Sequence, residues 1–177
     1  MVQIGSFHIG TADTVIRPTL TAGEAYVLWE NLIGRYQLLE LLMLAENYAH
    51  DKEFAYLIRD EIEGVLAKQI SILEKQFAHY SMPLPKRPPK SIDFEANSGS
   101  LRDRYIFRRV FTNVQEFLAV CSLSVKVTTV NDELREMFLK MLMEKINVFD
   151  NLCKYGMLKG WFEVPPFMTQ LNSYVRV

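Results

Sequence analysis

The chain has 177 residues, of which 49% are hydrophobic and 23% charged, a composition typical of globular proteins that excludes a disordered chain. The formal net charge of −1 gives no overall electric field that would favour nucleic acid or an anionic membrane as a partner. This length suits one domain with a sizeable core, so residues 1–177 are expected to form a single four-helix bundle domain.

Residues 1–20 are predicted to be an N-terminal arm. They lack a basic stretch followed by an apolar one, so no secretory signal peptide is expected. The longest apolar stretches of the chain are interrupted by Glu, Lys or Arg before they reach the roughly 20 residues that a bilayer span needs. No membrane association is therefore predicted.

The first helix is predicted over residues 22–50. Apolar residues recur there at alternating steps of three and four, which is the spacing of one helix face. Thr21 and Glu24 have the spacing of a capping box, which indicates where the helix starts. The expected inward residues are Ala25, Trp29, Leu32, Tyr36, Leu39 and Met43.

A second helix is predicted over residues 51–80. Asp51 is placed to cap its start, and Pro83 and Pro85 prevent it from continuing. The residues expected to face the core are Phe54, Ile58, Ile62, Val65, Ile72 and Phe77.

Two more helices are predicted in the second half of the chain. The third begins near Ser100, with an acidic residue three positions later, and ends in the β-branched run "VKVTTV". Asn131 or Thr129 is expected to cap the fourth, and Gly156 is expected to end it. Residues 157–177 are expected to be a tail that packs across one end of the bundle. The inward residues are expected to be Ile106, Val110, Phe117, Val120, Leu134, Phe138, Met141, Val148 and Leu152.

Residues 81–100, "SMPLPKRPPKSIDFEANSGS", form a proline-rich link between the two helical halves. Helices of about 27 residues are roughly 40 Å long, whereas an extended link of about 20 residues can reach roughly 60 Å. The link can therefore cross the whole bundle and leave the second and third helices parallel. The predicted fold is all-α: a ferritin-like four-helix bundle with one long crossover between helices 2 and 3.

Cys121 and Cys153 are expected to remain free thiols. In an antiparallel pair of helices that turns near residue 130, they lie on the order of 20 Å apart along the bundle axis. A disulfide needs Cα atoms within about 7 Å.

Each predicted helix carries an acidic residue near its middle: Glu40, Glu63, Glu116 and Glu144. Ferritin-like metal centres combine such acids with Glu-x-x-His pairs on two of the helices. Those pairs are missing here, because Leu66 and Asn147 stand where the histidines would be. Two interpretations remain open. The four glutamates form an all-carboxylate site for iron or manganese, or they lie on solvated faces and pair with Lys and Arg.

Gln69 and Asn113 both fall on predicted inward faces. We expect them to form a buried polar layer that fixes the register of the helices, because buried amides must find hydrogen-bond partners. A ligand pocket lined by Tyr36, Met43 and Met141 is a weaker hypothesis.

Other polar and aromatic groups have two interpretations each. His50 and His79 lie at predicted helix ends, where a cap or local ion pair is favoured over a metal ligand. The arginines of "LRDRYIFRR" are expected to form a solvated face rather than a nucleic-acid site. Trp161, Phe162 and Phe167 form a dimer surface or, preferably, close one end of their own bundle.

Three stretches carry a family resemblance: "LTAGEAYVLWENLIGRY", "MPLPKRPPKSIDF" and "CKYGMLKGWFEVPPF". In this order they resemble the uncharacterised ferritin-like bundle proteins related to spore coat protein F of endospore-forming bacteria. The resemblance spans nearly the whole chain and rests on Trp29, on Pro83 and Pro85, and on the Gly156…Pro165-Pro166 ending. It implies a helical bundle, a sporulation-linked setting and no established reaction.

The resemblance also implies a second copy of the chain as partner and the loss of one histidine that could bind a metal. Many relatives carry two such bundles in tandem, which suggests that two copies of this chain associate as a homodimer. Relatives often have His where this chain has Gln69, and Gly-Phe where it has Lys86-Arg87, so a metal served by that histidine would be lost here.

Two functions follow as hypotheses. The first is a non-enzymatic structural or interaction protein, cytoplasmic or spore-associated, with spore coat proteins as partners and with no catalytic residues or cofactor. The alternative is a metal-binding ferritin-like protein that uses the four mid-helix glutamates for iron or manganese handling or as an oxidase.

Overall fold

The computed structural model describes residues 2–4, 7–9, 19–89, 92 and 101–164. Near the N-terminus, β1 (Val2–Ile4) and β2 (Phe7–Ile9) form a two-stranded antiparallel hairpin in which Gln3 pairs with His8. The sequence analysis assigned residues 1–20 to an arm and did not predict these strands.

The helices lie close to their predicted positions. They are α1 (Ala22–Tyr48), α2 (Lys52–Asp60), the π-helical segment η1 (Glu61–Leu66), α3 (Ala67–His79), α4 (Asp103–Val127) and α5 (Asp132–Leu158). The second predicted helix is thus one continuous run with a π segment in its middle. The helical bundle is confirmed for the described part of the chain.

Local capping explains where the helices start. Thr21 and Glu24 form the predicted capping box of α1, with Glu24 N donating to Thr21 Oγ1 over 3.2 Å and Thr21 N donating to Glu24 Oε2 over 2.9 Å. Asp51 caps α2 by accepting from the backbone N–H groups of Glu53 and Phe54. Asn131 caps α5 by accepting from the N–H of Leu134, so Asn131 rather than Thr129 is the cap.

The end of α5 corrects one prediction. Gly156 lies inside the helix and is buried, whereas Gly160 adopts a φ of +65° just beyond the helix end. The N–H of Trp161 donates to the carbonyl of Gly156, and the N–H of Gly160 donates to that of Met157, the hydrogen-bond pattern of a Schellman motif. The prediction of Gly156 as the terminating residue was wrong, because both glycines suit a helix end and only one of them lies there.

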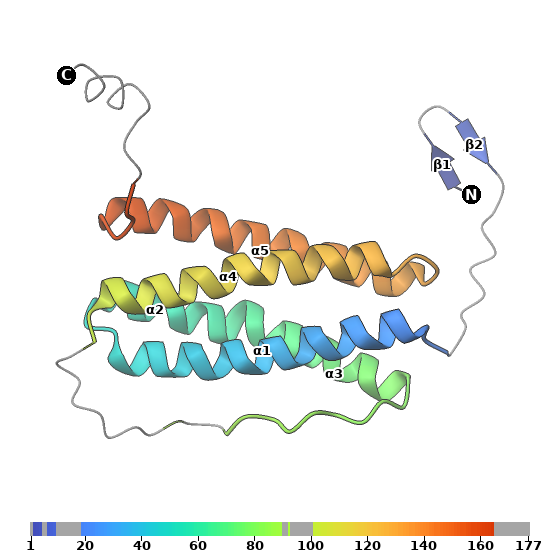
Figure 1. The fold of residues 1–177 in the computed structure, drawn as a ribbon, viewed down its shortest axis with the longest axis horizontal. Helices are drawn as coiled ribbons and strands as arrows, with labels where there is room; N and C mark the ends of the chain where they lie inside the picture. Colours follow the sequence, from blue (N-terminus) through green and yellow to red (C-terminus); the bar gives the residue numbers. More distant parts are fainter. Residues whose placement is uncertain (1, 5–6, 10–18, 90–91, 93–100, 165–177) are drawn as a thin grey trace, which may run out of the picture.

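Four long helical segments, α1, α2–η1–α3, α4 and α5, form a bundle. In it α2–η1–α3 and α4 run in the same direction (Figure 1). Two contacts show this. The carboxylate of Asp103, at the start of α4, accepts from the backbone N–H groups of His50 and Asp51 at the start of α2. At the other end, Asn131 Nδ2 donates to Tyr80 Oη over 2.7 Å. The predicted crossover by the proline-rich link is therefore present.

The described part of the link lies along the outside of the bundle (Figure 1). Arg87 Nε lies 3.4 Å from Glu74 Oε1 of α3, and Asn47 Nδ2 of α1 donates to the backbone oxygen of Ile92 over 3.0 Å. The link thus passes from the end of α3 towards the end of α1, next to the start of α4.

One end of the bundle is closed by aromatic side chains. Trp161 contacts Phe54 and Phe107 with ring centroids 5.3 and 5.4 Å apart, and Phe162 contacts Phe111 at 4.9 Å. These two tail residues therefore pack on their own bundle, as the favoured interpretation predicted. Phe167 lies outside the described residues.

Helix α4 is, among the described residues, long and apolar enough to cross a membrane by length and composition alone. Core helices of bundles meet the same criterion, and α4 packs along both α1 and α5.

Candidate functional site

A network of buried polar side chains crosses the middle of the bundle. Its centre is Arg35 of α1, which is fully buried and uses all three guanidinium nitrogens as donors. Nε donates to Gln69 Oε1 over 2.9 Å, Nη1 donates to Asn31 Oδ1 over 2.8 Å, and Nη2 lies 3.3 Å from Met141 Sδ. Arg35 thus connects α1 to α3 and α5.

The network continues to α4 and to a carboxylate. Asn31 Nδ2 donates to Ser124 Oγ over 2.6 Å, and Gln69 Nε2 donates to Glu144 Oε2 over 2.6 Å. We refer to Asn31, Arg35, Gln69, Ser124 and Glu144 as the buried polar network. Because its members come from α1, α3, α4 and α5, it holds these helices in a fixed register.

A second buried cation lies next to the network. Lys145 of α5 is 1% exposed and its Nζ donates to Glu61 Oε1 of η1 over 3.0 Å. The Phe117 ring lies 4.9 Å from Arg35 Cζ and 6.0 Å from Lys145 Nζ, so both cations are within range of a cation–π interaction.

Burial shifts the pKa values of the groups in this region. It lowers the pKa of the Arg35 guanidinium, an effect that the neighbouring Cys121, Glu144 and Glu61 oppose. Burial also raises the pKa of the Cys121 thiol, with Arg35 opposing. The thiol is therefore held in its neutral form, which is poorly nucleophilic. Cys121 and Cys153 are both free.

The four predicted metal ligands lie in different environments. Glu63 and Glu116 are exposed, whereas Glu40 and Glu144 are half-buried. Glu144 accepts a hydrogen bond from Gln69. Within the described ranges, no three His, Cys, Asp or Glu side chains gather closely enough to hold a metal ion. The structure therefore does not bring these four glutamates together as one carboxylate cluster.

The two amides of the predicted polar layer, Gln69 and Asn113, also lie in different environments. Gln69 is 1% exposed and lies in the buried polar network, hydrogen-bonded to Arg35 and Glu144. Asn113 is half-buried, and its Oδ1 is buried without a hydrogen-bond partner among the described residues. The layer that fixes register thus contains Gln69 together with charged side chains rather than with Asn113.

The remaining polar predictions can be placed as well. His50 is exposed and its Nδ1 lies 3.8 Å from Asp103 Oδ1, the local pairing expected at a helix end. Arg104 and Arg108 lie on the exposed face of α4, with guanidinium nitrogens 3.2 and 2.9 Å from Glu163 Oε1. The solvated face predicted for this arginine-rich stretch is confirmed at these two positions.

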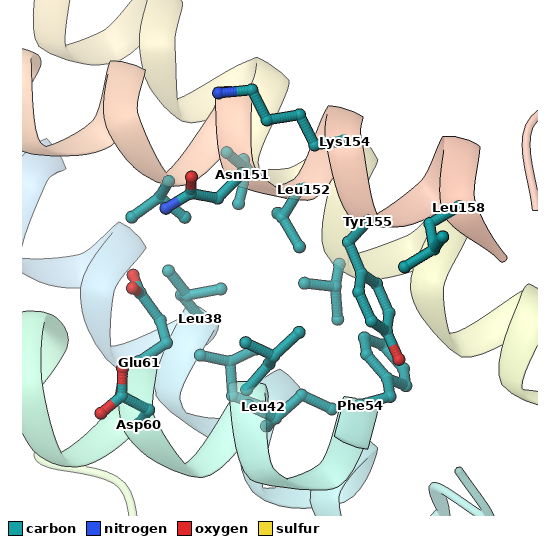
Figure 2. A pocket seen from close by; sticks show the side chains of 15 residues that line it. Leu38, Leu42, Phe54, Asp60, Glu61, Asn151, Leu152, Lys154, Tyr155 and Leu158 are labelled. Atoms are coloured by element: carbon teal, nitrogen blue, oxygen red, sulfur yellow. The ribbon is translucent and has the colours of Figure 1, made fainter. Parts of the chain in front are cut away.

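A cavity of about 370 Å³ lies between α2–η1 on one side and α5 on the other, with residues of α1 and α4 forming its base (Figure 2). Its wall is mainly apolar and includes Leu38, Leu42, Phe54, Ile58, Val110 and Leu152. Glu61, the partner of Lys145, also lines it. None of Tyr36, Met43 and Met141, which formed the hypothetical ligand pocket, lines this cavity.

Sequence reasoning missed both buried cations, although a signal for Lys145 was present. The predicted inward face of the fourth helix includes Phe138, Met141 and Val148, and the next step of four after Met141 falls on Lys145. Arg35 stands four residues after Asn31, so these two polar side chains lie on one face of α1. A charged residue that falls at the helical spacing of an apolar face indicates a buried ion pair.

Fold and interior together define a four-helix bundle protein with parallel middle helices and a charged network in its core. The chain matches, over residues 13–173, the family described as "Protein of unknown function (DUF3231)", and it belongs to that family.

The fold is shared with a solved structure. A protein from Bacillus halodurans C-125, described as a "putative spore coat protein", superimposes with a TM-score of 0.78. The two chains are 22% identical, and the match covers 85% of this chain and 98% of that one. The family match confirms that the chain belongs to an uncharacterised family, and the shared fold confirms the helical bundle that the resemblance implied. No curated protein matches this chain.

Proposed function

We propose that the chain is a non-enzymatic structural or interaction protein, built on a ferritin-like bundle and associated with the bacterial spore. The parallel middle helices and the long crossover are the arrangement that ferritin-like bundles have. The protein of known structure with the same fold is described as a "putative spore coat protein", which supports the spore as the place of action.

The observation that carries the proposal is that two acids next to the buried cations, Glu144 and Glu61, are already engaged by donors of the protein. Glu144 accepts from Gln69 over 2.6 Å, and Glu61 accepts from Lys145 over 3.0 Å. A metal centre needs several carboxylates that face a common point and are free to bind. In this bundle Glu61 instead pairs with the buried Lys145, and Glu144 accepts from the Gln69 amide that also binds Arg35, which is a structural use of charge.

Spore association is tested by fractionation of the organism that carries the gene. An antibody against the purified chain is used on purified spores, on detergent extracts of their coats and on lysates of growing cells, with a cytosolic enzyme as the marker of contamination. The chain is expected to be enriched in the coat extract. Recovery only in the lysate, together with the marker, would contradict spore association.

The non-enzymatic role is tested against metal binding. The protein, purified without a metal-binding tag, is analysed for Fe, Mn and Zn, and we expect far less than one equivalent of any of them. About one or two equivalents per chain, as a ferritin-like centre holds, would overturn the proposal if Glu116→Ala and Glu144→Ala variants lost them.

Self-association is part of the same proposal. Large apolar side chains are exposed in the middle of α2 and at the end of α5: Tyr56 (69%), Leu57 (41%), Met157 (72%) and Leu158 (79%). Leu57 and Leu158 line the same cavity. Exposed apolar groups that lie together support a protein-binding surface. Light scattering at micromolar concentration is expected to give the mass of two chains, reduced to one by Met157→Glu. A parent protein with the mass of one chain would contradict the proposed dimer.

A further inference from the structure

The cavity between α2–η1 and α5 has the properties of a ligand site. Its volume of about 370 Å³ falls within the roughly 300–1,000 Å³ of small-molecule pockets. Phe54 and Ile58, two of its wall residues, are 0% and 3% exposed, so core packing holds this part of the wall in place. Apolar atoms that face an unfilled space lose dispersion contacts, which an apolar occupant would restore.

One end of the cavity is polar. Figure 2 shows Glu61 and Asn151 at the same end, with Phe54, Tyr155 and Leu158 towards the other. The Glu61 side chain lines the edge of the space on the side of Asn151. Lys145 Nζ donates to its Oε1, and the described residues donate no hydrogen bond to its Oε2. Glu61 therefore offers a fixed acceptor to a donor group of an occupant.

The charges around the cavity favour an uncharged head group. Lys145 already balances the charge of Glu61, and the side chains of Asp60 and Lys154 point away from the space in Figure 2. A ligand carboxylate would meet the carboxylate of Glu61. A ligand ammonium would give up its hydration without an unpaired counter-charge to replace it.

The backbone provides a second, independent observation. Glu61 is the first residue of the π segment η1, and single π turns inside α-helices occur frequently at functional sites. The wider turn changes the phase of the helix between Ile58 and Leu66, both of which are buried. Glu61 can therefore face the cavity between two residues that pack in the core.

We propose that this cavity binds a small uncharged amphiphile: a medium-length alkyl chain with a hydroxyl head group. The chain lies along the apolar wall, and the hydroxyl donates to Glu61 Oε2 and accepts from the side-chain amide of Asn151. This binding site does not require the proposed structural role, but Leu57 and Leu158 belong both to its wall and to the proposed dimer surface.

The test uses 1-hexanol, 1-octanol and 1-decanol as probes, titrated calorimetrically into the full chain. Each added methylene is expected to tighten binding about fourfold until the cavity is filled. Octanoate and octylammonium, which have the same chain length but carry a charge, are expected to bind at least tenfold more weakly than 1-octanol.

Two variants and a matched control locate the site. Val148→Trp fills the cavity and is expected to abolish binding, whereas Ile146→Trp, on the exposed side of the same helix, is expected to leave it unchanged. Asn151→Leu, at an exposed position, is expected to weaken 1-octanol binding severalfold while the methylene increment remains. Circular dichroism checks that each variant is folded.

Three results would each overturn the proposal. They are a lack of chain-length dependence, equal affinities of the two tryptophan variants for 1-octanol, and octanoate binding as tightly as 1-octanol.

Discussion

Two buried cations with hydrogen-bond partners in the core are the main residue-level feature of this bundle. Removing an ion from water costs several kcal/mol, and only good geometry with satisfied hydrogen bonds offsets that cost. Arg35 meets this condition with donors directed at Gln69, Asn31 and Met141. Lys145 meets it with Glu61. These contacts select one register of the helices rather than adding much to stability.

Lys145→Met is expected to lower the free energy of unfolding by about 3 kcal/mol, because it leaves the partly buried carboxylate of Glu61 without a counter-charge. The double variant Lys145→Met/Glu61→Gln is expected to recover most of this loss. Urea denaturation followed by circular dichroism measures both. Lys140→Met, at an exposed lysine of the same helix, is the control and should change stability by less than about 0.5 kcal/mol. A double variant as unstable as the single one would contradict the interpretation.

Asp51 joins the start of α2 to the end of α5 and makes stability depend on pH. Its carboxylate caps α2 and accepts from Lys159 Nζ over 2.7 Å, and this hydrogen bond is the main reason why the pKa of Asp51 is lowered. A carboxylate whose pKa is lower in the folded state stabilises the fold above its unfolded pKa of about 3.9. That contribution is lost as the pH falls from this value through the folded pKa.

Asp51→Asn is therefore expected to lower the melting temperature at pH 7, and the difference from the parent should shrink as the pH falls below about 4. Thermal denaturation at pH 7, 5, 4 and 3 measures it. Glu133→Gln, at an exposed acid in the first turn of α5, should show no such pattern. A difference between Asp51→Asn and the parent that stays constant down to pH 3 would exclude the ionised carboxylate as the cause.

At the scale of elements, two glycines let α4 approach its neighbours closely. A Cβ at Gly34 of α1 would lie 2.4 Å from Cε2 of Phe117, and a Cβ at Gly156 of α5 would lie 2.4 Å from Cζ of Phe107. Phe117 is also the ring against which both buried cations lie. The position of α4 and the geometry of the network therefore depend on the missing side chain at Gly34.

Gly34→Ala and Gly64→Ala are expected to change stability in opposite directions. Gly34→Ala should destabilise the protein by about 1–3 kcal/mol, because the new methyl group overpacks against Phe117. Gly64→Ala should stabilise it by up to about 1 kcal/mol, since a Cβ there meets no atom within 4 Å and alanine has the higher helix propensity. Chemical denaturation measures both, and the same sign for both would refute the packing argument.

The extent to which these elements could be predicted depends on whether the signal is local. Thr21, Glu24, Asp51 and Asn131 act within three residues of their own position, so the sequence revealed the starts of α1, α2 and α5. The π segment has no such local signal. Its wider turn leaves the predicted core residues Ile62 and Val65 half-buried and buries Leu66 instead.

The candidate site was less predictable because it is formed by tertiary contacts. Gln69 was recognised as inward, but its partners Arg35 and Glu144 lie far from it in sequence. The cavity depends on the distance between α2–η1 and α5, which no periodicity in a single helix encodes. Sequence patterns could thus indicate which faces are buried, but not which polar groups meet there.

For the whole molecule, the proline-rich link determines which way the helices run. The connection between His79 and Asp103 has to span the length of the helical segment α2–η1–α3, residues 52–79, which is about 42 Å long at 1.5 Å per residue. Short helix connections would instead make α3 and α4 antiparallel neighbours. The side chains of the buried polar network would then no longer meet, because Gln69 lies on α3 and Ser124 on α4, the two helices that this link joins.

Deleting residues 86–99 tests this dependence. The remaining connection of about nine residues reaches roughly 32 Å at most, which is too short to join the end of α3 to the start of α4 in one bundle. The deleted chain is therefore expected to lose cooperative thermal unfolding or to exchange α4–α5 with a second copy and gain mass. Circular dichroism and light scattering measure these two outcomes.

A chain in which the same residues are replaced by an equally long Gly-Ser segment is the control. It should keep the parent's mass and fold, because the length that the link can span is preserved although its sequence is not. If the deleted chain kept the parent's mass and melting temperature, the lengthwise crossover would not be what sets the direction of α4.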